Sequence, residues 1–160
     1  MKYIQLTQGK QAVIDDRDYE YLSSWKWCAH SPKPGKWYAV RSQTIGFMKR
    51  IQIKMHRLIL SAPNGIHVDH INGNGLDNRR DNIRLCNNTQ NNYNSRKQSR
   101  ITTSNFKGVS FDRESRKWSA HITIVGKRVR IGRFVSEVEA ARAYDAEARR
   151  LYGEFARTNF

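Results

Sequence analysis

The first 60 residues alternate between short apolar runs and polar turn signals. Two such runs flank Gln8-Gly9-Lys10, which predicts a hairpin. Aromatic runs at 25–30 and 36–42 flank the turn signal at 31–35 and predict two further strands. The other expected elements are short helices over 15–25 and 55–60 and a strand over 51–54. This part of the chain is predicted to be a small β-rich module.

Residues 66–97 follow the order strand, loop, strand, helix. The stretch 66–70 alternates between apolar and polar positions, and a second short strand is expected over 82–85. The run between them is rich in Asn, Asp and Gly, which are typical of turns. A helix is expected over 87–97 from its position, although asparagine is a weak helix former. Residues of about 66–94 are predicted to form a compact ββα unit.

The pattern changes after residue 94. Residues 95–104 have no apolar side chain except Ile101, and we interpret them as a basic linker. Three strand-like runs over 106–112, 117–125 and 127–134 then predict a three-stranded antiparallel sheet. A well-signalled helix follows, which begins at the capping-box pair Ser136 and Glu139 and stops at Gly153. Its small alanines would let it pack closely on the sheet.

The predicted fold class is α+β, in three parts. Residues 1–94 are expected to form the β-rich extension and the ββα unit, and residues 95–104 the linker. Residues 105–160 are expected to form a second domain, in which the sheet packs on one helix.

Charge is the most informative feature of the composition. The 160 residues include 29 Lys and Arg against 14 Asp and Glu, a net charge of +15. Residues 1–100 carry 17 basic and 7 acidic residues, and residues 101–160 carry 12 and 7, so both halves are positive. Positive charge spread over folded segments favours an extended polyanion, most plausibly nucleic acid, as the partner.

Two further features narrow the class. There is no run of about 18 apolar residues and no apolar secretory signal at the start, so no membrane partner is expected. Cys28 and Cys86 form no CxxC pair, which argues against a zinc knuckle and a disulfide scaffold. No disulfide-linked partner is expected, and a reducing cytoplasm fits this cysteine usage.

The polar run over 68–91 holds a single histidine beside an aspartate. Phosphodiester hydrolysis needs an activated water and charge relief at the phosphate and the leaving oxygen, which a histidine and one divalent metal can supply. Neutral His70 could accept a proton from water at neutral pH. Asp69 and Asn91 could offer oxygen ligands, which suit Mg²⁺ better than Zn²⁺. Because Asp69 and His70 alternate along a strand, a local twist or bend is needed to bring both to one site.

The run VDHINGNGLDNRRDNIRLCNNTQNNYN, preceded by MHRLIL, resembles the HNH nuclease family, and within it the homing-endonuclease branch with the pattern Asp-His, Asn, Asn. The resemblance implies that His70 is the general base. It implies that Asp69 and Asn91 bind Mg²⁺, with Mn²⁺ or another divalent metal as alternatives. Asn82 would be the central asparagine, which ties the long loop to the strands by hydrogen bonds.

Some positions leave alternatives open. Asn87 stands where relatives often have threonine, and further asparagines compete with Asn91 as the ligand; these are Asn88, Asn92 and Asn94. His56, at the start of an apolar helix, is interpreted as structural support for the site, with a phosphate contact as the alternative. Turn and cap roles explain the remaining polar positions, which are Asp77, Asn78 and Asp81.

The C-terminal sheet is basic: residues 105–133 hold eight basic and two acidic residues. The segment from FKGV through KWSAHI, IGRF and EAARAYD to TNF resembles the Apetala-two or ethylene-response-factor DNA-binding domain. The resemblance implies a sheet that enters the major groove. The candidate contacts are Lys107, Arg113, Trp118, Arg128 and Arg130. The base preference of the family cannot be transferred to this chain, because Ser110, His121 and Thr123 differ from the family residues. In the alternative interpretation the sheet does not contact DNA: Trp118 belongs to the core and the arginines are solvated.

The sequence thus predicts a metal-dependent HNH endonuclease of homing or mobile type that acts on double-stranded DNA in a bacterial or phage-infected cytoplasm. The expected products have 5′-phosphate and 3′-hydroxyl ends. A monomer would nick one strand, unless it forms a homodimer or turns over. The alternatives are a non-catalytic DNA-binding regulator that kept the HNH scaffold, an RNA-binding or RNA-cleaving protein, and a host-defence or packaging nuclease.

Overall fold

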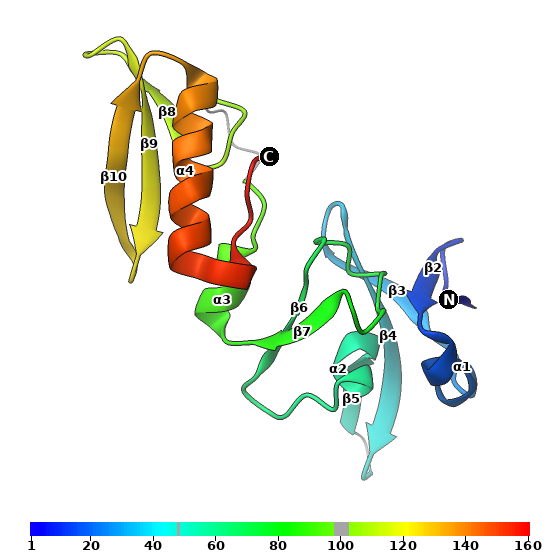
Figure 1. Cartoon of the computed structure of the whole chain (residues 1–160). Coiled ribbons are helices and arrows are strands. Elements are labelled where there is room, and N and C mark those ends of the chain that lie inside the picture. Colours follow the sequence, from blue (N-terminus) through cyan, green and yellow to red (C-terminus); the bar gives the residue numbers. More distant parts are fainter. Residues whose placement is uncertain (48, 98–102) are drawn as a thin grey trace. The chain divides into compact units, whose positions relative to one another are not determined.

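The computed structural model describes residues 1–47, 49–97 and 103–160 and separates into two compact units, Met1–Asn91 and Asn92–Phe160 (Figure 1). Each unit has a hydrophobic core of its own. Residues 98–102 of the predicted linker lie outside the described residues.

The first unit is built mainly from short antiparallel strands. Its strands are β1 (Lys2–Gln5), β2 (Gln11–Ile14), β3 (Cys28–Lys33), β4 (Lys36–Ile45), β5 (Lys49–Lys54), β6 (His67–His70) and β7 (Ile83–Cys86). As far as the structure describes them, they form a β1–β2 pair, a sheet in the order β3-β4-β5, and a β6–β7 pair. The helices are α1 (Asp16–Ser23), α2 (Met55–Ile59) and α3 (Asn88–Tyr93), the last of which crosses the division between the units.

Several elements of the first unit each contribute one apolar face to its core. Ala12 and Ile14 alternate along β2 and are fully buried, as is Leu22 of α1. Met55 of α2 joins the same cluster. The Trp27 ring is also buried, and its indole N–H donates to the Leu22 carbonyl at 2.9 Å, so this donor is satisfied inside the core.

The long loop between β6 and β7 is held by the N-terminal elements. The Val13 N–H donates to the Leu76 carbonyl and the Asn78 N–H donates to the Val13 carbonyl, both at 2.8 Å. Arg80 donates two hydrogen bonds to Asp18 of α1, at 2.9 and 2.7 Å, and its backbone N–H donates to the Asp15 carboxylate. The β1–β2 pair and α1 therefore brace this loop.

Helix α3 begins with a reciprocal cap. The Asn87 N–H donates to the Gln90 side chain at 2.9 Å, and the Gln90 N–H donates to the Asn87 side chain at 2.8 Å. This capping box satisfies two N–H groups at the helix start and offsets the weak helix propensity of asparagine. The helix ends at Tyr93 and is shorter than the predicted 87–97.

The second unit is a sheet covered on one face by a helix (Figure 1). Its elements are β8 (Val109–Asp112), β9 (Lys117–Ile124), β10 (Lys127–Phe134), α4 (Glu137–Tyr152) and a short 3₁₀ turn at Gly153–Phe155. The strand order is β10-β9-β8. Ala120 and Ile122 of β9 contribute to the cores that α4 completes with Ala141 and Tyr144. A Cβ at Gly108 would come within 2.1 Å of the Tyr144 ring, so this helix can lie against the sheet only with glycine there.

Polar contacts secure both ends of the second unit. The buried Asp145 carboxylate of α4 accepts hydrogen bonds from the backbone N–H groups of Asn159 and Phe160, which ties the C-terminal residues to the helix. At the other end, the Tyr93 ring stacks on Tyr152 with 3.7 Å between centroids. The cap predicted at Ser136 and Glu139 is present.

The predicted mixture of several small sheets and few helices is confirmed. The turn predicted at 31–35 is present but shorter, because β3 continues through Lys33 and only Pro34 and Gly35 lie between β3 and β4. Pro32 lies where the β3–β4 register shifts, and its missing N–H costs little at such an irregularity. The assignment of residues 1–94 and 105–160 to nuclease and DNA-binding domains stays a prediction.

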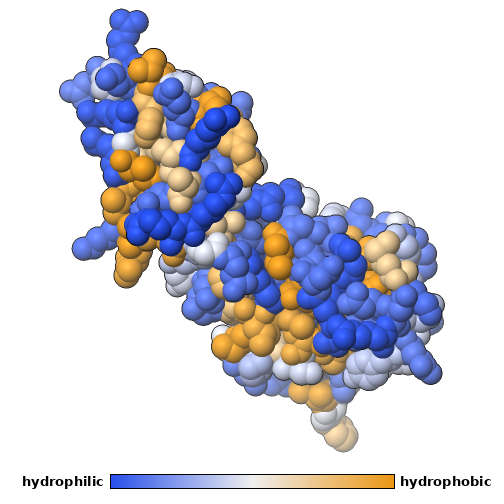
Figure 2. All heavy atoms as spheres, viewed as in Figure 1, coloured by the Kyte–Doolittle hydropathy of each residue, from blue (hydrophilic) through white to orange (hydrophobic). Residues whose placement is uncertain are grey.

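The surface of the described residues is mostly polar. Figure 2 shows hydrophilic residues over most of the visible face, with smaller hydrophobic patches between them. None of the helices in the described part of the chain combines the length and the apolar content that a bilayer crossing requires.

The close approach of the β6–β7 loop to β4 yields a stability prediction. A Cβ at Gly75 would lie 2.3 Å from the Trp37 carbonyl oxygen and 2.7 Å from the Tyr38 ring. Because a strand carbonyl cannot move aside freely, we expect Gly75→Ala to lower the free energy of unfolding by about 2 kcal/mol. Urea denaturation of the whole protein measures this change.

Gly9→Ala is the matched control. Gly9 has open space around it and only a positive φ of 64°, so alanine there should cost about 1 kcal/mol or less. Equal losses for the two variants would contradict the packing role of Gly75.

Candidate functional site

Asp69 and His70 form the end of β6, where it pairs with β7. Asp69 lies opposite Arg84, and His70 lies opposite Ile83. The Arg84 guanidinium donates to Asp69 Oδ2 through Nη2 at 3.0 Å and through Nε at 3.2 Å. Asp69 is only 6% exposed, so a guanidinium rather than bulk water compensates this carboxylate.

The His70 ring is positioned by aromatic neighbours from two elements. His56 of α2 packs against it edge to face, with 4.9 Å between ring centroids. Tyr38 of β4 lies 6.0 Å from the same ring. His70 is 6% exposed, so this packing rather than solvent determines its orientation.

Asn78 determines which nitrogen of His70 carries the proton. Its Oδ1 lies 3.1 Å from His70 Nε2, and its Nδ2 donates to the Leu76 carbonyl at 3.3 Å. The second contact orients the amide so that its oxygen faces the imidazole. Neutral His70 therefore donates from Nε2 to Asn78 and carries its lone pair on Nδ1.

Burial keeps the two histidines of the site uncharged. It lowers the pKa of His70 below its ordinary value, although the Asn78 hydrogen bond and two nearby carboxylates act in the opposite direction. Burial also lowers the pKa of His56 to about 3, with smaller contributions from His70 and neighbouring cations. Within the described residues, His56 Nδ1 is buried without a hydrogen-bond partner, so this ring acts as an apolar neighbour.

Asn82 connects the two ends of the β6–β7 loop. Its Oδ1 accepts from the Asn72 N–H at 3.0 Å, and its Nδ2 donates to the Asp77 carbonyl at 2.7 Å. The Asn72 side chain in turn donates to the Asp77 carboxylate at 2.8 Å. A loop of this composition is thus ordered by its own side chains, and the buried Asn82 is the residue through which it closes.

Asn91 belongs to α3, which only Asn87 separates from the end of β7. Its side chain is half-buried, whereas the competing Asn88 and Asn92 are exposed. The other competitor, Asn94, is buried beyond the end of the helix. Exposure therefore separates Asn91 from the two asparagines on the outer side of the helix.

The oxygen ligands predicted at Asp69 and Asn91 are of the kind that a hard divalent ion prefers. In the part of the chain that the structure covers, no group of three His, Cys, Asp or Glu side chains could hold a metal. A carboxylate at Asp69 and an amide at Asn91 would leave most ligand positions to water and substrate oxygens. Mg²⁺ and Mn²⁺ tolerate such a shell, while Zn²⁺ prefers a fuller set of nitrogen and sulfur ligands.

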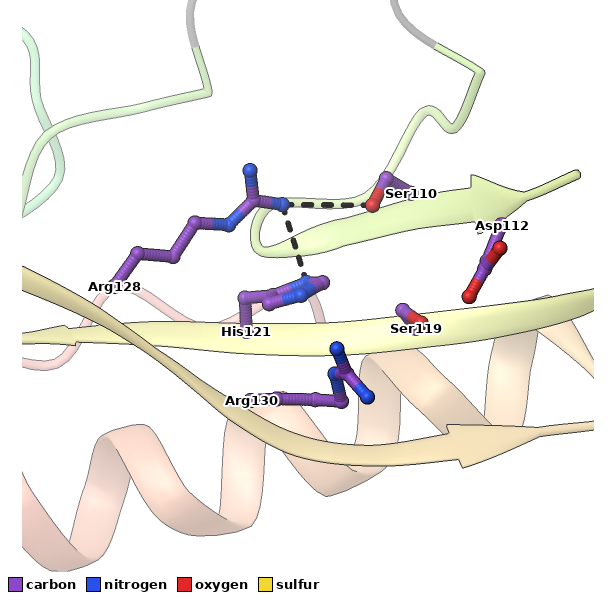
Figure 3. A pocket seen from close by; sticks show the side chains of 6 residues that line it. All are labelled: Ser110, Asp112, Ser119, His121, Arg128 and Arg130. Atoms are coloured by element: carbon purple, nitrogen blue, oxygen red, sulfur yellow. Dashed lines mark hydrogen bonds between the residues drawn. The ribbon is translucent and has the colours of Figure 1, made fainter. Parts of the chain in front are cut away.

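A second polar site lies on the face of the β8–β10 sheet away from α4. It is a hollow of about 410 Å³, called here the polar hollow, and Figure 3 shows its lining residues. They are Ser110, Asp112, Ser119, His121, Arg128 and Arg130. Beside it, Arg133 forms an ion pair with Asp112 at 3.1 Å.

The predicted DNA contacts fall into two groups. Arg128 and Arg130 line the polar hollow, and Arg113 is exposed between β8 and β9. Trp118 packs edge to face on Phe111 at 5.0 Å and against the core, because alternation along β9 places it on the α4 side. Trp118 is therefore partly buried against the core, which favours the alternative role, and its DNA contact stays a prediction.

Lys107 is also directed away from the hollow. Its ammonium donates to the carbonyls of Tyr93 and Ser95 at 2.7 and 2.8 Å. Burial lowers the pKa of Lys107 to about 8. The residue ties the start of the second unit to its sheet, and the structure gives no support to a DNA contact there.

Sequence patterns missed three residues around His70. Asn78 was interpreted as a turn residue, yet it is fully buried against the imidazole. Arg84 and Tyr38 were not singled out. Alternation in the two strands could have placed Arg84 opposite Asp69, but no local signal connects Tyr38 with His70, because β4 is remote in sequence.

Comparisons with known proteins agree with this site. A sequence model described as HNH endonuclease matches residues 54–93. A protein of Acanthamoeba polyphaga mimivirus that is named an uncharacterized HNH endonuclease is 32% identical over 147 residues, which cover 88% of this chain and 74% of that protein. Protein 3.8 of Escherichia phage T7 is 35% identical over 95 residues, 59% of this chain and 77% of that protein.

Plant transcription factors are also similar to part of this chain. An AP2-like ethylene-responsive transcription factor of Arabidopsis thaliana is 41% identical over 66 residues, which are 41% of this chain and 14% of the plant protein. No solved structure matches the chain significantly. The mimivirus relative is similar over most of both chains, and the HNH match includes the hairpin that carries Asp69 and His70, so this chain belongs to the HNH endonuclease family.

Proposed function

We propose that this protein is a site-selective DNA endonuclease of homing or mobile-element type, in which β6, β7 and α3 form a ββα-metal unit. One observation carries the proposal: His70 is buried and uncharged, its Nε2 is held by Asn78, and it adjoins the Asp69 carboxylate. A proton acceptor beside an oxygen ligand is what phosphodiester hydrolysis requires.

His70 would be the general base. Because the contact with Asn78 places the ring proton on Nε2, Nδ1 would take the proton from water. The resulting hydroxide attacks phosphorus in line and the bond to the 3′ oxygen breaks, after which that oxygen takes up a proton. The products are a 5′-phosphate and a 3′-hydroxyl end.

Asp69 and Asn91 would hold the divalent metal, with Mg²⁺ as the first candidate and Mn²⁺ as the alternative. A bound ion of this kind supplies positive charge to the phosphate and to the leaving oxygen. Arg84 keeps the Asp69 carboxylate at the hairpin through two hydrogen bonds. His56 would support the site by packing on His70, and Asn82 by closing the loop.

The second unit would select the DNA site. Its local similarity to plant AP2-like factors and its basic sheet, with Arg128 and Arg130 on the exposed face, support an AP2-like DNA-binding domain over 105–160. Double-stranded DNA would then contact both parts of the chain. One catalytic site hydrolyses one strand, so double-strand cutting would need a homodimer or a second turnover.

Plasmid cleavage tests the catalytic proposal. In Mg²⁺, the whole protein should nick or linearise supercoiled DNA that carries its native locus, and EDTA should stop the reaction. His70→Ala should cut at least about 100-fold more slowly, because general base catalysis contributes that much or more. Agarose gels of time courses measure the rates.

His67→Ala is the control, because His67 is an exposed histidine on the same strand. It should cut at the wild-type rate. If His70→Ala cuts as fast as wild type, the role of His70 is refuted. If the wild type binds DNA but does not cut it with any divalent metal, the protein is a non-catalytic DNA-binding regulator.

Thermal unfolding without DNA tests the metal ligands. Arg84→Met removes the guanidinium that compensates the buried Asp69 carboxylate and should destabilise the protein by about 3 kcal/mol in EDTA. A divalent ion can then compensate Asp69, so Mn²⁺ should raise the Tm of this variant more than that of wild type. Asp69→Asn should abolish the Mn²⁺ effect, and Asn91→Leu should reduce it.

Arg80→Met and Asn88→Leu are the controls. Arg80→Met removes a comparable ion pair in the β6–β7 loop, with Asp18 instead of Asp69 as the partner, and Asn88 is an exposed residue of α3. Neither change should alter the response to Mn²⁺. A Tm shift that persists in Asp69→Asn would show that the ion binds elsewhere.

A further inference from the structure

The hairpin of β4 and β5 has two faces of different character. One face is apolar, because Ile51 and Ile53 of β5 are half-buried there. The residues that alternate with them on β5 are polar and exposed, and so are the two β4 residues paired with that set. The members of this second face, called here the hairpin polar face, are Ser42, Thr44, Arg50, Gln52 and Lys54. Because they are exposed, packing in the core does not explain their composition.

The hairpin polar face begins beside the candidate catalytic site. Lys54 places its ammonium 5.8 Å from the centroid of the Tyr38 ring, and that ring also packs on His70. The chain continues from Lys54 into α2, whose His56 packs on His70 as well. Arg50 is four residues from Lys54 along β5, or about 13 Å away. Figure 1 shows the hairpin extending past α2, so the face leads outward from the site.

The charged residues of the hairpin are all basic. No acidic residue occurs in the sequence between Glu20 and Asp69, whereas residues 21–68 include eight Lys and Arg. The hairpin polar face therefore presents an ammonium, a guanidinium, two hydroxyls and an amide, with no carboxylate among them. The phosphates of a nucleic acid are negative and only accept hydrogen bonds, so they complement such a set.

We propose that the hairpin polar face binds the phosphate backbone of duplex DNA on one side of the bond that is cut, with Lys54 nearer to the cut and Arg50 farther from it. The proposal rests on the proposed function, in which His70 acts on the scissile phosphate. Contacts with phosphates position a duplex without reading its bases. The hairpin would hold any duplex within reach of His70, and the rest of the protein would select the sequence.

Binding measurements at several salt concentrations test the charge of this face. Lys54→Gln and Arg50→Gln each remove one cation but keep a polar side chain. Each should weaken binding of the target and of unrelated duplex by the same factor, several-fold at low salt. Each should also lower the slope of log K against log salt concentration by about one, because one phosphate contact is lost. Fluorescence anisotropy of labelled duplexes in EDTA, where the DNA stays uncut, measures both quantities.

Lys49→Gln is the matched control. Lys49 is exposed and precedes Arg50 on the same strand, but alternation places it on the opposite face, where it pairs with Ile45. Its removal changes the net charge of the protein by the same amount and should leave the salt slope close to that of wild type. Thermal melting should show that all three variants are folded.

Neutral phosphates locate the contacts. A single methylphosphonate replaces one charged phosphate of the duplex by an uncharged group. At the phosphate that Lys54 contacts, this change should weaken binding of wild type and of Arg50→Gln but not of Lys54→Gln. The phosphate that depends on Arg50 should lie farther from the cut on the same side. Mapping the ends of the cleaved DNA gives the position of the cut.

Two outcomes would overturn the proposal. If Lys49→Gln lowers the salt slope as much as Arg50→Gln, or if no single phosphate depends on Lys54 or Arg50, the face makes no specific backbone contact. If either variant weakens only the target sequence, the residue reads bases instead of phosphates. Failure of the wild type to cut would refute the catalytic proposal alone, because the phosphate dependence is measured without cleavage.

Discussion

Closure of the β6–β7 loop is the constraint on which the catalytic unit depends. This segment is polar, yet Asp77, Asn78 and Asn82 are buried in it. Each buried polar group needs a partner, because an unsatisfied one costs about 1–3 kcal/mol. Asn82 and Asp77 satisfy the loop from within, and the backbone of Val13 satisfies it from outside. The N-terminal elements are thus required for the site, although they contribute no candidate catalytic group.

The same closure determines the electrostatics of the site. Asn78 can reach His70 only because the loop folds back over the hairpin, and this packing shields both His70 and His56 from water. Burial disfavours the charged imidazole, which keeps His70 ready to accept a proton. Arg84 compensates the neighbouring carboxylate of Asp69, a charge that burial would otherwise make costly.

Sequence patterns predicted most elements because their signals are local. Alternation over two residues marked the strands, and the Ser136 and Glu139 pair marked the start of α4. For the candidate site, the sequence could place Asp69 and His70 together only because they are neighbours along the chain. Other contacts join segments whose proximity no local pattern encodes. They are the bonds between Arg80 and Asp18 and between Asn78 and His70, and the packing of Tyr38 on His70. The polar lining of the hollow likewise could not be predicted from local patterns, because it depends on the register of three strands.

The cap of α3 has a consequence for how sequences of this kind can diverge. Asn87 and Gln90 fix where the helix starts, and each further residue turns the helix by about 100°. Outward-facing asparagines such as Asn88 can therefore be replaced with little effect on the orientation of Asn91. One inserted or deleted residue between the cap and Asn91 would turn that amide to another side without unfolding anything. Between the cap and Asn91, the number of residues should therefore be conserved more strictly than the residue types.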